Sequence, residues 1–167
     1  MRLIAVQEQD FDQGGLLAEL GQDAVGGIAS FTGLVRQTPD GSLAALRLEH
    51  YPGMTEKALN ALADEAAARW ALSGCIIIHR VGRLAPGQNI VFVATASAHR
   101  AEALAATAYL IDQLKTRAPF WKAEETLSGE TRWVASRHTD DEAAAAWQAR
   151  QKNTIPAKNL PQGKGRL

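Results

Sequence analysis

The sequence has very little cysteine, with Cys75 alone among 167 residues. A single cysteine cannot form a disulfide within the chain, and it cannot build a thiolate cluster around a metal ion. Cys75 opens the apolar run 75–78, where a free cysteine is typically a small buried residue. We therefore expect a core that needs no disulfide, and we expect neither a metal site nor a cofactor.

An excess of either charge is also absent. Lysine and arginine number 18, aspartate and glutamate also number 18, and the formal net charge is zero. Such a balance gives no general attraction to nucleic acid or to an anionic membrane surface. No apolar run approaches the roughly 20 residues of a membrane span, and residues 1–13 lack the apolar core of a signal peptide. We expect a cytoplasmic protein that binds neither nucleic acid nor membrane.

The length and composition indicate one globular domain. A chain of 167 residues is about one domain long, and its 46% apolar and 22% charged residues are ordinary for a globular protein. From residue 148 onward the sequence is polar and basic, with prolines and glycines. Such a composition favours disorder. We predict a domain over 1–147 and a flexible basic C-terminal tail over 148–167.

The hydrophobic pattern predicts a mixed α+β class. Two long helices are expected, at 54–72 and 98–117, because apolar residues recur there every three or four positions. Two hairpins are expected, one around the turn at 38–41 and one around Ser128 and Gly129. The expected strands are 2–7, 25–36, 43–50, 75–81, 90–96, 120–126 and 131–136, with short helices at 16–20 and 142–150.

His99 and Arg100 stand at the start of the second long helix. A helix N-terminus presents unpaired N–H groups and a partial positive charge, so cationic side chains are unfavourable there for the helix itself. The pair suits a site for a phosphate or another anion. The alternative is that both are solvated surface residues, which is common for single charges.

Lys115 follows Leu104, Ala108 and Ile111 at spacings of four, three and four. It therefore continues an apolar helical stripe. If that stripe is buried, the lysine is partly desolvated, which lowers its pKa and suits it to act as a nucleophile or acid–base group. The alternatives are a lysine whose stem packs while its ammonium reaches water, and a cation that stabilises the helix C-terminus.

The remaining polar residues carry weaker signals. Arg36 ends a predicted strand and is interpreted as solvated; His79 and Arg80 end a buried strand and are interpreted as structural. His50 and His138 have no informative neighbours. No Ser-His-Asp order, phosphate-binding glycine loop or zinc spacing is present in the sequence. Spacing alone therefore supports a globular protein with an anion site.

Five segments together resemble one known family, the large catalytic subunit of molybdopterin synthase, or MoaE family. They occur in the family's order within a resemblance that covers about residues 2–147. That family has an α/β hammerhead fold, so the resemblance implies a hammerhead-like mixed fold with β-hairpins and two main helices. The segments are 25–36, 48–54, 78–84, 97–102 and 114–122.

The resemblance also implies a function. The family's enzyme is a transferase that adds two sulfurs to cyclic pyranopterin monophosphate, forming the dithiolene of molybdopterin in molybdenum cofactor biosynthesis. The sulfur arrives as a thiocarboxylate on the C-terminal Gly-Gly of a small ubiquitin-fold subunit. The family assembles as a heterotetramer, with a central homodimer of large subunits and one small subunit at each end.

Site residues follow from the same resemblance. Lys115 and Lys122 match two essential lysines, and Arg36 matches a pocket arginine. His99 and Arg100 match contacts to the substrate anion that the neighbouring protomer supplies. Covalent capture and proton transfer both remain open as roles for the lysines. The full implied substrate-binding set is Leu34, Val35, Arg36, His99, Arg100, Lys115, Lys122, Ala123 and Glu124.

Two positions depart from the family pattern. Leu34 stands where a polar or basic residue is common, and Ala123 stands where a second basic residue is frequent. Both departures are expected to weaken peripheral substrate contacts. Two alternative functions remain: a non-catalytic paralogue that only binds a ubiquitin-fold partner, which the presence of both lysines disfavours, and an unrelated phosphate-binding enzyme, which explains one segment of the five.

Overall fold

The computed structural model describes residues 1–134 and 141–147. The predicted tail at 148–167 lies outside the described residues, as does the predicted end of the last strand at 135–136. Residues 141–147 are helical, which agrees with the described part of the short helix expected at 142–150. Within the described ranges, no helix is long and apolar enough to cross a membrane.

Sheet A forms the body of the molecule. Its strands lie in the order β1 (Arg2–Gln7), β4 (Leu72–Arg80), β6 (Asn89–Ser97) and β2 (Gly27–Leu34). The β1–β4 pair is parallel, and the other two pairs are antiparallel. The central strands β4 and β6 are buried over all but their first two residues, and their middles are apolar, as expected for strands covered on both faces.

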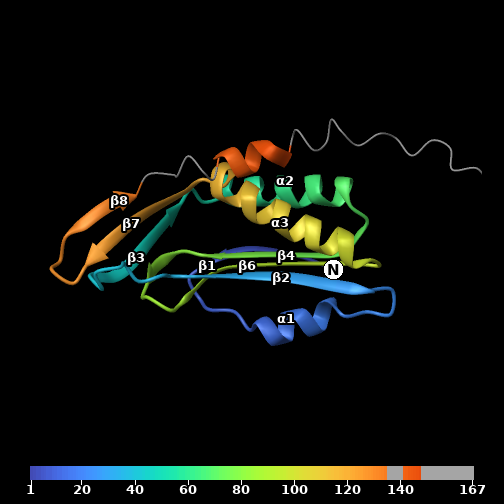
Figure 1. The fold of residues 1–167 in the computed structure, drawn as a ribbon, viewed down its shortest axis with the longest axis horizontal. Helices are drawn as coiled ribbons and strands as arrows, with labels where there is room; N and C mark the ends of the chain where they lie inside the picture. The colour runs from blue at the N-terminus through green and yellow to red at the C-terminus, as the bar shows by residue number, and fades with distance from the viewer. Residues whose placement is uncertain (135–140, 148–167) are drawn as a thin grey trace, which may run out of the picture.

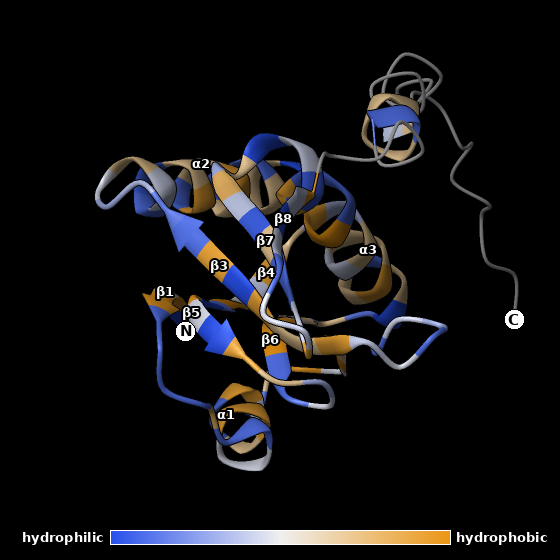
Figure 2. Cartoon of the chain, turned by 90° about the vertical axis from the view of Figure 1, so that its left-hand side faces the viewer, coloured by the Kyte–Doolittle hydropathy of each residue, from blue (hydrophilic) through white to orange (hydrophobic). Residues whose placement is uncertain are grey.

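Helices cover both faces of sheet A. α2 (Met54–Arg69) and α3 (Arg100–Arg117) lie on one face, and α1 (Gln13–Leu20) lies on the other (Figure 1). The alternation of side chains along β4 supplies both cores: Ile77 packs toward α2 and α3, whereas Ile76 packs toward α1. Seen from the end of the molecule, α1 is separated from α2 and α3 by the sheet (Figure 2).

Sheet B stands at one end of sheet A. Its antiparallel strands lie in the order β5 (Gly82–Leu84), β3 (Leu43–His50), β7 (Phe120–Thr126) and β8 (Thr131–Val134) (Figure 1). A small core of its own holds it, built from Val35, Leu43, Leu48 and Leu84. After the end of α3, the chain enters this second sheet as β7.

Glu65 ties the two long helices together. Its carboxylate accepts hydrogen bonds from the Tyr109 hydroxyl at 2.6 Å and from the Arg117 guanidinium at 2.8 and 2.6 Å. The Arg117 charge and hydrogen bonds lower the pKa of Glu65 to about 2. Since Glu65 belongs to α2 and its two partners to α3, this cluster fixes the C-terminal half of α3.

The α+β class and the β7–β8 hairpin are confirmed, but the first predicted hairpin is wrong. β2 pairs with β6, and β3 pairs with β5 and β7. After β2, the Val35 N–H donates to the Gln88 carbonyl at 2.9 Å, and the Gly87 N–H donates to the Val35 carbonyl at 2.8 Å. These bonds hold Val35 against the 85–88 loop, so the chain does not turn back to pair along β2. The turn at 38–41 does form, but it links strands of different sheets.

Among the predicted boundaries that shift, those between α2 and β4 have a clear physical cause. α2 ends at Arg69 because Trp70 already has extended backbone angles, with φ −130° and ψ 146°. β4 then begins at Leu72 instead of at residue 75, and Gly74 lies inside the strand. A side chain at Gly74 would press on Leu20, so this glycine serves close packing against α1 and does not end a helix.

Candidate active site

The length of α3 separates the predicted site residues into two groups. Arg100 begins the helix, and His99 is its exposed N-cap residue, whose side chain makes no capping hydrogen bond. Lys115 follows Arg100 by fifteen residues, which at 1.5 Å per residue is about 22 Å along the helix. One chain therefore does not bring the His99–Arg100 pair next to Lys115.

The expectation that Lys115 lies on a buried stripe is wrong. Lys115 is exposed, and Leu104 on the same stripe has an exposed fraction of 61%. α3 is rich in alanine and carries a second apolar stripe, and it is this second one that packs against the sheet and α2. Its buried members include Ala103, Ala106, Tyr109, Leu110 and Leu114. Lys115 instead occupies the last turn of α3, where a cation stabilises the helix dipole.

Lys122 has the surroundings that were expected for Lys115. It is half-buried on β7, directly opposite Leu48 of β3 and Val134 of β8. Residues opposite each other in a sheet project from the same face, and Leu48 is a fully buried member of the small core. The side chain of Lys122 therefore lies beside apolar side chains, which partly exclude water from it.

A buried histidine lies beneath this region. His79, at the end of β4, is 6% exposed, and its Nδ1 lies 2.8 Å from the Arg80 carbonyl oxygen. Its ring stacks on Phe120 with centroids 3.7 Å apart and planes 16° apart. Phe120 precedes Lys122 by two residues and so shares its face of the strand. His79 was interpreted as structural from the sequence, and its 41-residue separation from Phe120 hid this contact.

Burial, with a smaller contribution from the positive charge of Lys122, lowers the pKa of His79 to about 4. His79 is therefore neutral at neutral pH. A neutral imidazole next to a lysine adds no positive charge that would repel the ammonium. The imidazole of His79 thus contributes to the packing near Lys122 without changing the net charge there.

The low pKa of His79 predicts an acid-dependent loss of stability. Unfolding returns its pKa from about 4 to the ordinary 6.5, so between these values the unfolded chain binds more protons. The contribution of neutral His79 to the free energy of unfolding is on the order of 3 kcal/mol. It is fully present above pH 6.5 and is lost as pH falls toward 4. Urea unfolding of the His79→Phe variant, which keeps a ring against Phe120, should depend less on pH in this window. His99→Gln, at an exposed position, is the matched control; an unchanged pH dependence in His79→Phe would contradict the assignment.

The end of β2 approaches sheet B. Val35 is 3% exposed and packs into the small core beside Leu48, the residue opposite Lys122. Its neighbours Leu34 and Arg36 are exposed. Since Val35 anchors this segment, the structure places Arg36 at the same end of the molecule as Lys122, and away from His99 and Arg100.

Ala123 and Glu124 occupy different environments. Ala123 is completely buried, so its side chain offers no surface to a bound molecule. Glu124 accepts a hydrogen bond from Arg132 at 3.0 Å across the β7–β8 hairpin. The departure at Ala123 therefore changes the packing of sheet B more than it changes an accessible charge.

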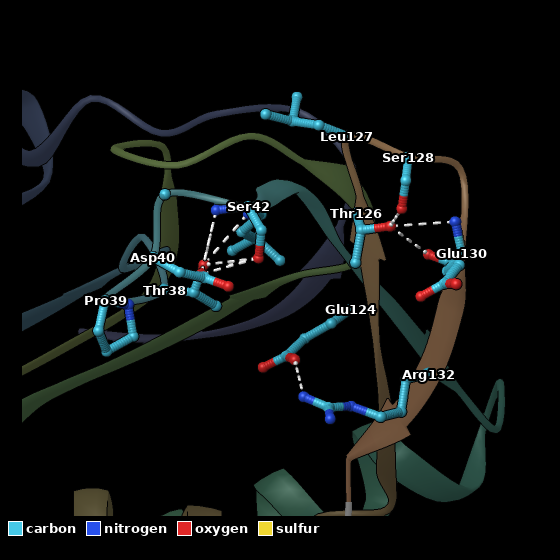
Figure 3. A pocket seen from close by; sticks show the side chains of 12 residues that line it. Thr38, Pro39, Asp40, Ser42, Glu124, Thr126, Leu127, Ser128, Glu130 and Arg132 are labelled. Carbon is cyan, nitrogen blue, oxygen red and sulfur yellow. Dashed lines mark hydrogen bonds and ion pairs between the residues drawn. The ribbon is translucent and has the colours of Figure 1, made fainter.

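Glu124 also lines a polar hollow of about 770 Å³ between the 38–43 loop and the β7–β8 hairpin (Figure 3). Its lining contains Asp40, Glu124 and Glu130 against a single cation, Arg132. Hydrogen bonds from the Thr38 and Ser42 side chains lower the pKa of Asp40 to about 2, so this carboxylate is charged at neutral pH. The hollow is net negative and does not suit an anionic substrate.

The single cysteine and the other possible metal ligands give no further site. Cys75 is buried, as predicted, and burial raises the pKa of its thiol to about 11, which disfavours the reactive thiolate. Among residues 1–134 and 141–147, no group of three or more His, Cys, Asp and Glu side chains could hold a metal ion. The cationic residues at the two ends of α3 thus remain the groups with chemistry to offer.

Comparison with known proteins points to one family. A family model described as MoaE protein matches residues 6–117. A molybdopterin synthase catalytic subunit from Ralstonia nicotianae is 52% identical over 150 residues, which cover 88% of this chain and 85% of that protein. The similarity therefore spans both sheets and both long helices.

Solved structures agree in fold. A molybdopterin biosynthesis MoaE protein from Burkholderia ambifaria superposes with a TM-score of 0.75 at 49% identity, covering 89% of this chain and 99% of that one. A chain from Helicobacter pylori, solved as a protein–protein complex of subunits 1 and 2 of molybdopterin-converting factor, gives a TM-score of 0.67 at 19% identity. It covers 80% of this chain and 92% of that one, and at this identity the likeness is one of fold.

Proposed function

This chain belongs to the MoaE protein family, and we propose that it acts as the sulfur-transferring catalytic subunit of a molybdopterin synthase. The observation that carries the proposal is the 52% identity with a molybdopterin synthase catalytic subunit over 88% of the chain. An enzyme of molybdenum cofactor biosynthesis follows from that likeness. The sulfur transfer, its substrate and its residues are the finer parts of the proposal.

The proposed substrate is cyclic pyranopterin monophosphate, which carries a phosphate. Arginine and histidine near a helix N-terminus suit such an anion, because the N–H groups and the helix dipole attract negative charge. His99 and Arg100 fulfil this condition at the start of α3. We propose that they hold the phosphate, while Arg36, Lys115 and Lys122 surround the atoms that receive sulfur.

The two lysines support different parts of the chemistry. Lys122 lies beside apolar side chains, where a partly desolvated amine exchanges protons or attacks a carbonyl more readily than one in water. Lys115 is exposed and can meet a thiocarboxylate that arrives from solvent. We propose that Lys122 moves the proton or captures the acyl group and that Lys115 orients the incoming anion.

The proposed sulfur donor is a small ubiquitin-fold subunit with a C-terminal Gly-Gly thiocarboxylate. The Helicobacter pylori fold neighbour was solved as a complex of two subunits, which supports a partner of this kind. The family's heterotetramer also requires two copies of the present chain. The wide separation of His99 and Lys115 along α3 supports that requirement, since one chain leaves the site incomplete.

Mixing this protein with thiocarboxylated small subunit and cyclic pyranopterin monophosphate tests the proposal. Dithiolene product should form with the pterin and the partner together and with neither alone. The alternative is a non-catalytic paralogue that binds the small subunit. A stable complex that yields no dithiolene would favour that paralogue and overturn the enzymatic function.

Removing the anion contacts should weaken pterin binding. Each of His99→Ala and Arg100→Ala removes a charge-assisted hydrogen bond, which corresponds to a roughly 10- to 150-fold increase in the Kd for the pterin. Both side chains are exposed and His99 caps nothing, so folding should not change. Calorimetric titration with the pterin is the measurement.

The matched control is Arg2→Ala, which removes an exposed arginine whose partners are Asp64 and Asn60 on α2. Its pterin affinity should equal that of the unchanged protein, and binding of the small subunit should change little in all three variants. Unchanged pterin affinity in both His99→Ala and Arg100→Ala would rule out the assigned phosphate site.

A further inference from the structure

The segment that joins the two proposed site lysines is short. Lys115 lies in the last turn of α3, and Lys122 is the third residue of β7. Between the helix and the strand stand two residues: Ala118, with extended angles of φ −91° and ψ 125°, and Pro119. Proline has no N–H, so the backbone of Pro119 can be held only through its carbonyl oxygen. The group that binds this carbonyl therefore helps to fix the direction in which β7 leaves α3.

A buried threonine of α2 binds the Pro119 carbonyl. The Thr55 hydroxyl donates to that oxygen at 3.2 Å and accepts a hydrogen bond from the Tyr51 N–H at 3.2 Å. Thr55 is completely buried. A hydroxyl is costly to bury without partners, and here it has one as a donor and one as an acceptor. Valine has nearly the same shape and carries no such cost, so packing alone does not explain a threonine at this position.

The next residue, Phe120, is held by a different element. The ring of His79, at the end of β4, stacks on the Phe120 ring with centroids 3.7 Å apart. The Phe120 N–H also donates to the Ala118 carbonyl at 2.9 Å, which closes a three-residue turn. Two buried side chains, Thr55 and His79, thus hold two consecutive residues just before the lysine of β7.

The same contacts give a role to segment 48–54, which resembles the family but contains none of the proposed site residues. The segment begins with Leu48, which lies opposite Lys122 in the β3–β7 pair. At its other end, the Thr55 N–H donates to the Tyr51 carbonyl at 2.9 Å, so the turn before α2 sets the position of the threonine. The segment therefore starts beside one site lysine and leads directly to the hydroxyl that holds the approach to it.

α2 is a common support for both lysines. Glu65 of α2 pairs with Arg117, in the turn of α3 that carries Lys115. Thr55 of the same helix binds the carbonyl three residues before Lys122. The two supporting residues are ten positions apart on one continuous helix, about 15 Å along its axis. One rigid helix thus holds the chain on both sides of the segment that joins the lysines.

We propose that Thr55 is a positioning residue for sulfur transfer, which acts by fixing Lys122 relative to Lys115. This inference rests on the proposed function. The two lysines have separate roles in that function, so the reaction needs both amines at defined places around one substrate. A displacement of about 1 Å can slow a reaction roughly 100-fold. The Thr55 hydroxyl opposes such a displacement, because it ties the segment between the lysines to α2.

Substitutions of Thr55 separate positioning from stability. Thr55→Val keeps the shape of the side chain and removes the hydroxyl, so single-turnover dithiolene formation at saturating pterin should slow by roughly 10- to 100-fold. Thr55→Ser keeps the hydroxyl and should keep the rate. The Kd for the pterin should not change in either variant, because the proposed phosphate contacts lie at the other end of α3. A purely structural role would not divide rate from affinity in this way.

Thr95→Val is the matched control. Thr95 is also completely buried, and its hydroxyl donates to the Ala103 carbonyl at 2.7 Å, in the half of α3 remote from Lys115. Thr95→Val should lose stability in urea as Thr55→Val does, and it should keep the rate. An unchanged rate in Thr55→Val, or an equal loss of rate in Thr95→Val, would overturn the proposal.

A second pair of variants decides the question if Thr55→Val does not fold. Thr55→Ser and Thr55→Ala both lack the methyl group and differ only in the hydroxyl oxygen. The serine variant should transfer sulfur at nearly the normal rate, and the alanine variant should be slow. Equal rates in these two variants, or a serine variant as slow as Thr55→Val, would show that the hydroxyl does not position the lysines.

A measurement without substrate keeps this inference separate from the proposed function. Reductive methylation labels the lysine amines with ¹³C, and Lys115→Arg and Lys122→Arg assign the two resonances by their disappearance. Thr55→Val should shift the Lys122 resonance, whereas Thr55→Ser and Thr95→Val should leave it in place. An unshifted Lys122 resonance in Thr55→Val would overturn the inference.

The two readings fail in different ways. If the Lys122 resonance shifts as expected but the unchanged protein makes no dithiolene, the proposed function fails and the dependence of Lys122 on Thr55 stands. If the unchanged protein makes dithiolene and Thr55→Val makes it at the same rate, the positioning role fails and the function stands.

Discussion

Replacing Lys115 with alanine is expected to reduce sulfur transfer by about 100- to 10,000-fold, the range that a positioned proton-transfer or charge-stabilising group contributes. The fold should persist, because Lys115 is exposed and the buried face of α3 is left intact. The cost to α3 is the loss of one cation near its C-terminus, about 0.3–1 kcal/mol. Single-turnover dithiolene formation with thiocarboxylated partner, together with circular dichroism, is the measurement.

Two further variants separate the possible roles of Lys115. Lys115→Arg keeps the positive charge but stays protonated near neutral pH, so it should remain inactive if the amine exchanges a proton or attacks carbon. Recovery of activity by arginine would fit the proposed role of Lys115, in which its positive charge orients the incoming anion. Arg117→Ala is the matched control in the same turn; it should lose stability, because Arg117 pairs with Glu65, and keep activity. Full activity in Lys115→Ala would refute any catalytic role.

Mixed dimers of two inactive variants should regain about a quarter of the normal activity. Arg36→Ala and Arg100→Ala each damage both sites of their own homodimer. In the proposed assembly a site takes Arg36 from one chain and Arg100 from the other, so a mixed dimer has one intact site of two. Random pairing makes half of the dimers mixed, which gives about one quarter of wild-type sites. Dithiolene formation by the two coexpressed chains is the assay.

A second mixture serves as the control for this prediction. Arg36 and Lys115 enter the same site from the same chain, so a dimer of Arg36→Ala with Lys115→Ala contains no intact site. That mixture should remain inactive. Activity in both mixtures, or in neither, would contradict the proposed sharing of residues between chains.

The sequence predicted most elements of the fold because their signals are local. The apolar run that contains Ile76 and Ile77 needs only its own residues to be recognised as a buried strand. The partner of each strand is a different matter: Thr38 and Gly41 form the predicted turn, yet β2 and β3 do not pair. Pairing depends on where Val35 packs, and no local pattern records that.

The features of the candidate site also differ in whether local sequence could predict them. The helix start at His99 and Arg100 could be recognised from sequence, because a cation next to an unpaired helix N-terminus is a local anomaly. The burial of Lys115 could not, because an alanine-rich helix offers two apolar stripes and only tertiary packing selects one. The stacking of His79 on Phe120 joins residues of different sheets, so it too required the structure.

The strand order of sheet B carries a consequence for how the chain is made. β3 pairs with β7, so Leu48 cannot lie opposite Lys122 until 74 further residues have been synthesised. At 5–20 residues per second that interval is roughly 4–15 s. During it, among the described strands, β3 has as an earlier partner only β5, which is three residues long. The part of sheet B that carries Lys122 therefore forms late, and a chain truncated before residue 120 should expose the unpaired edge of β3, which favours aggregation, and lacks Lys122.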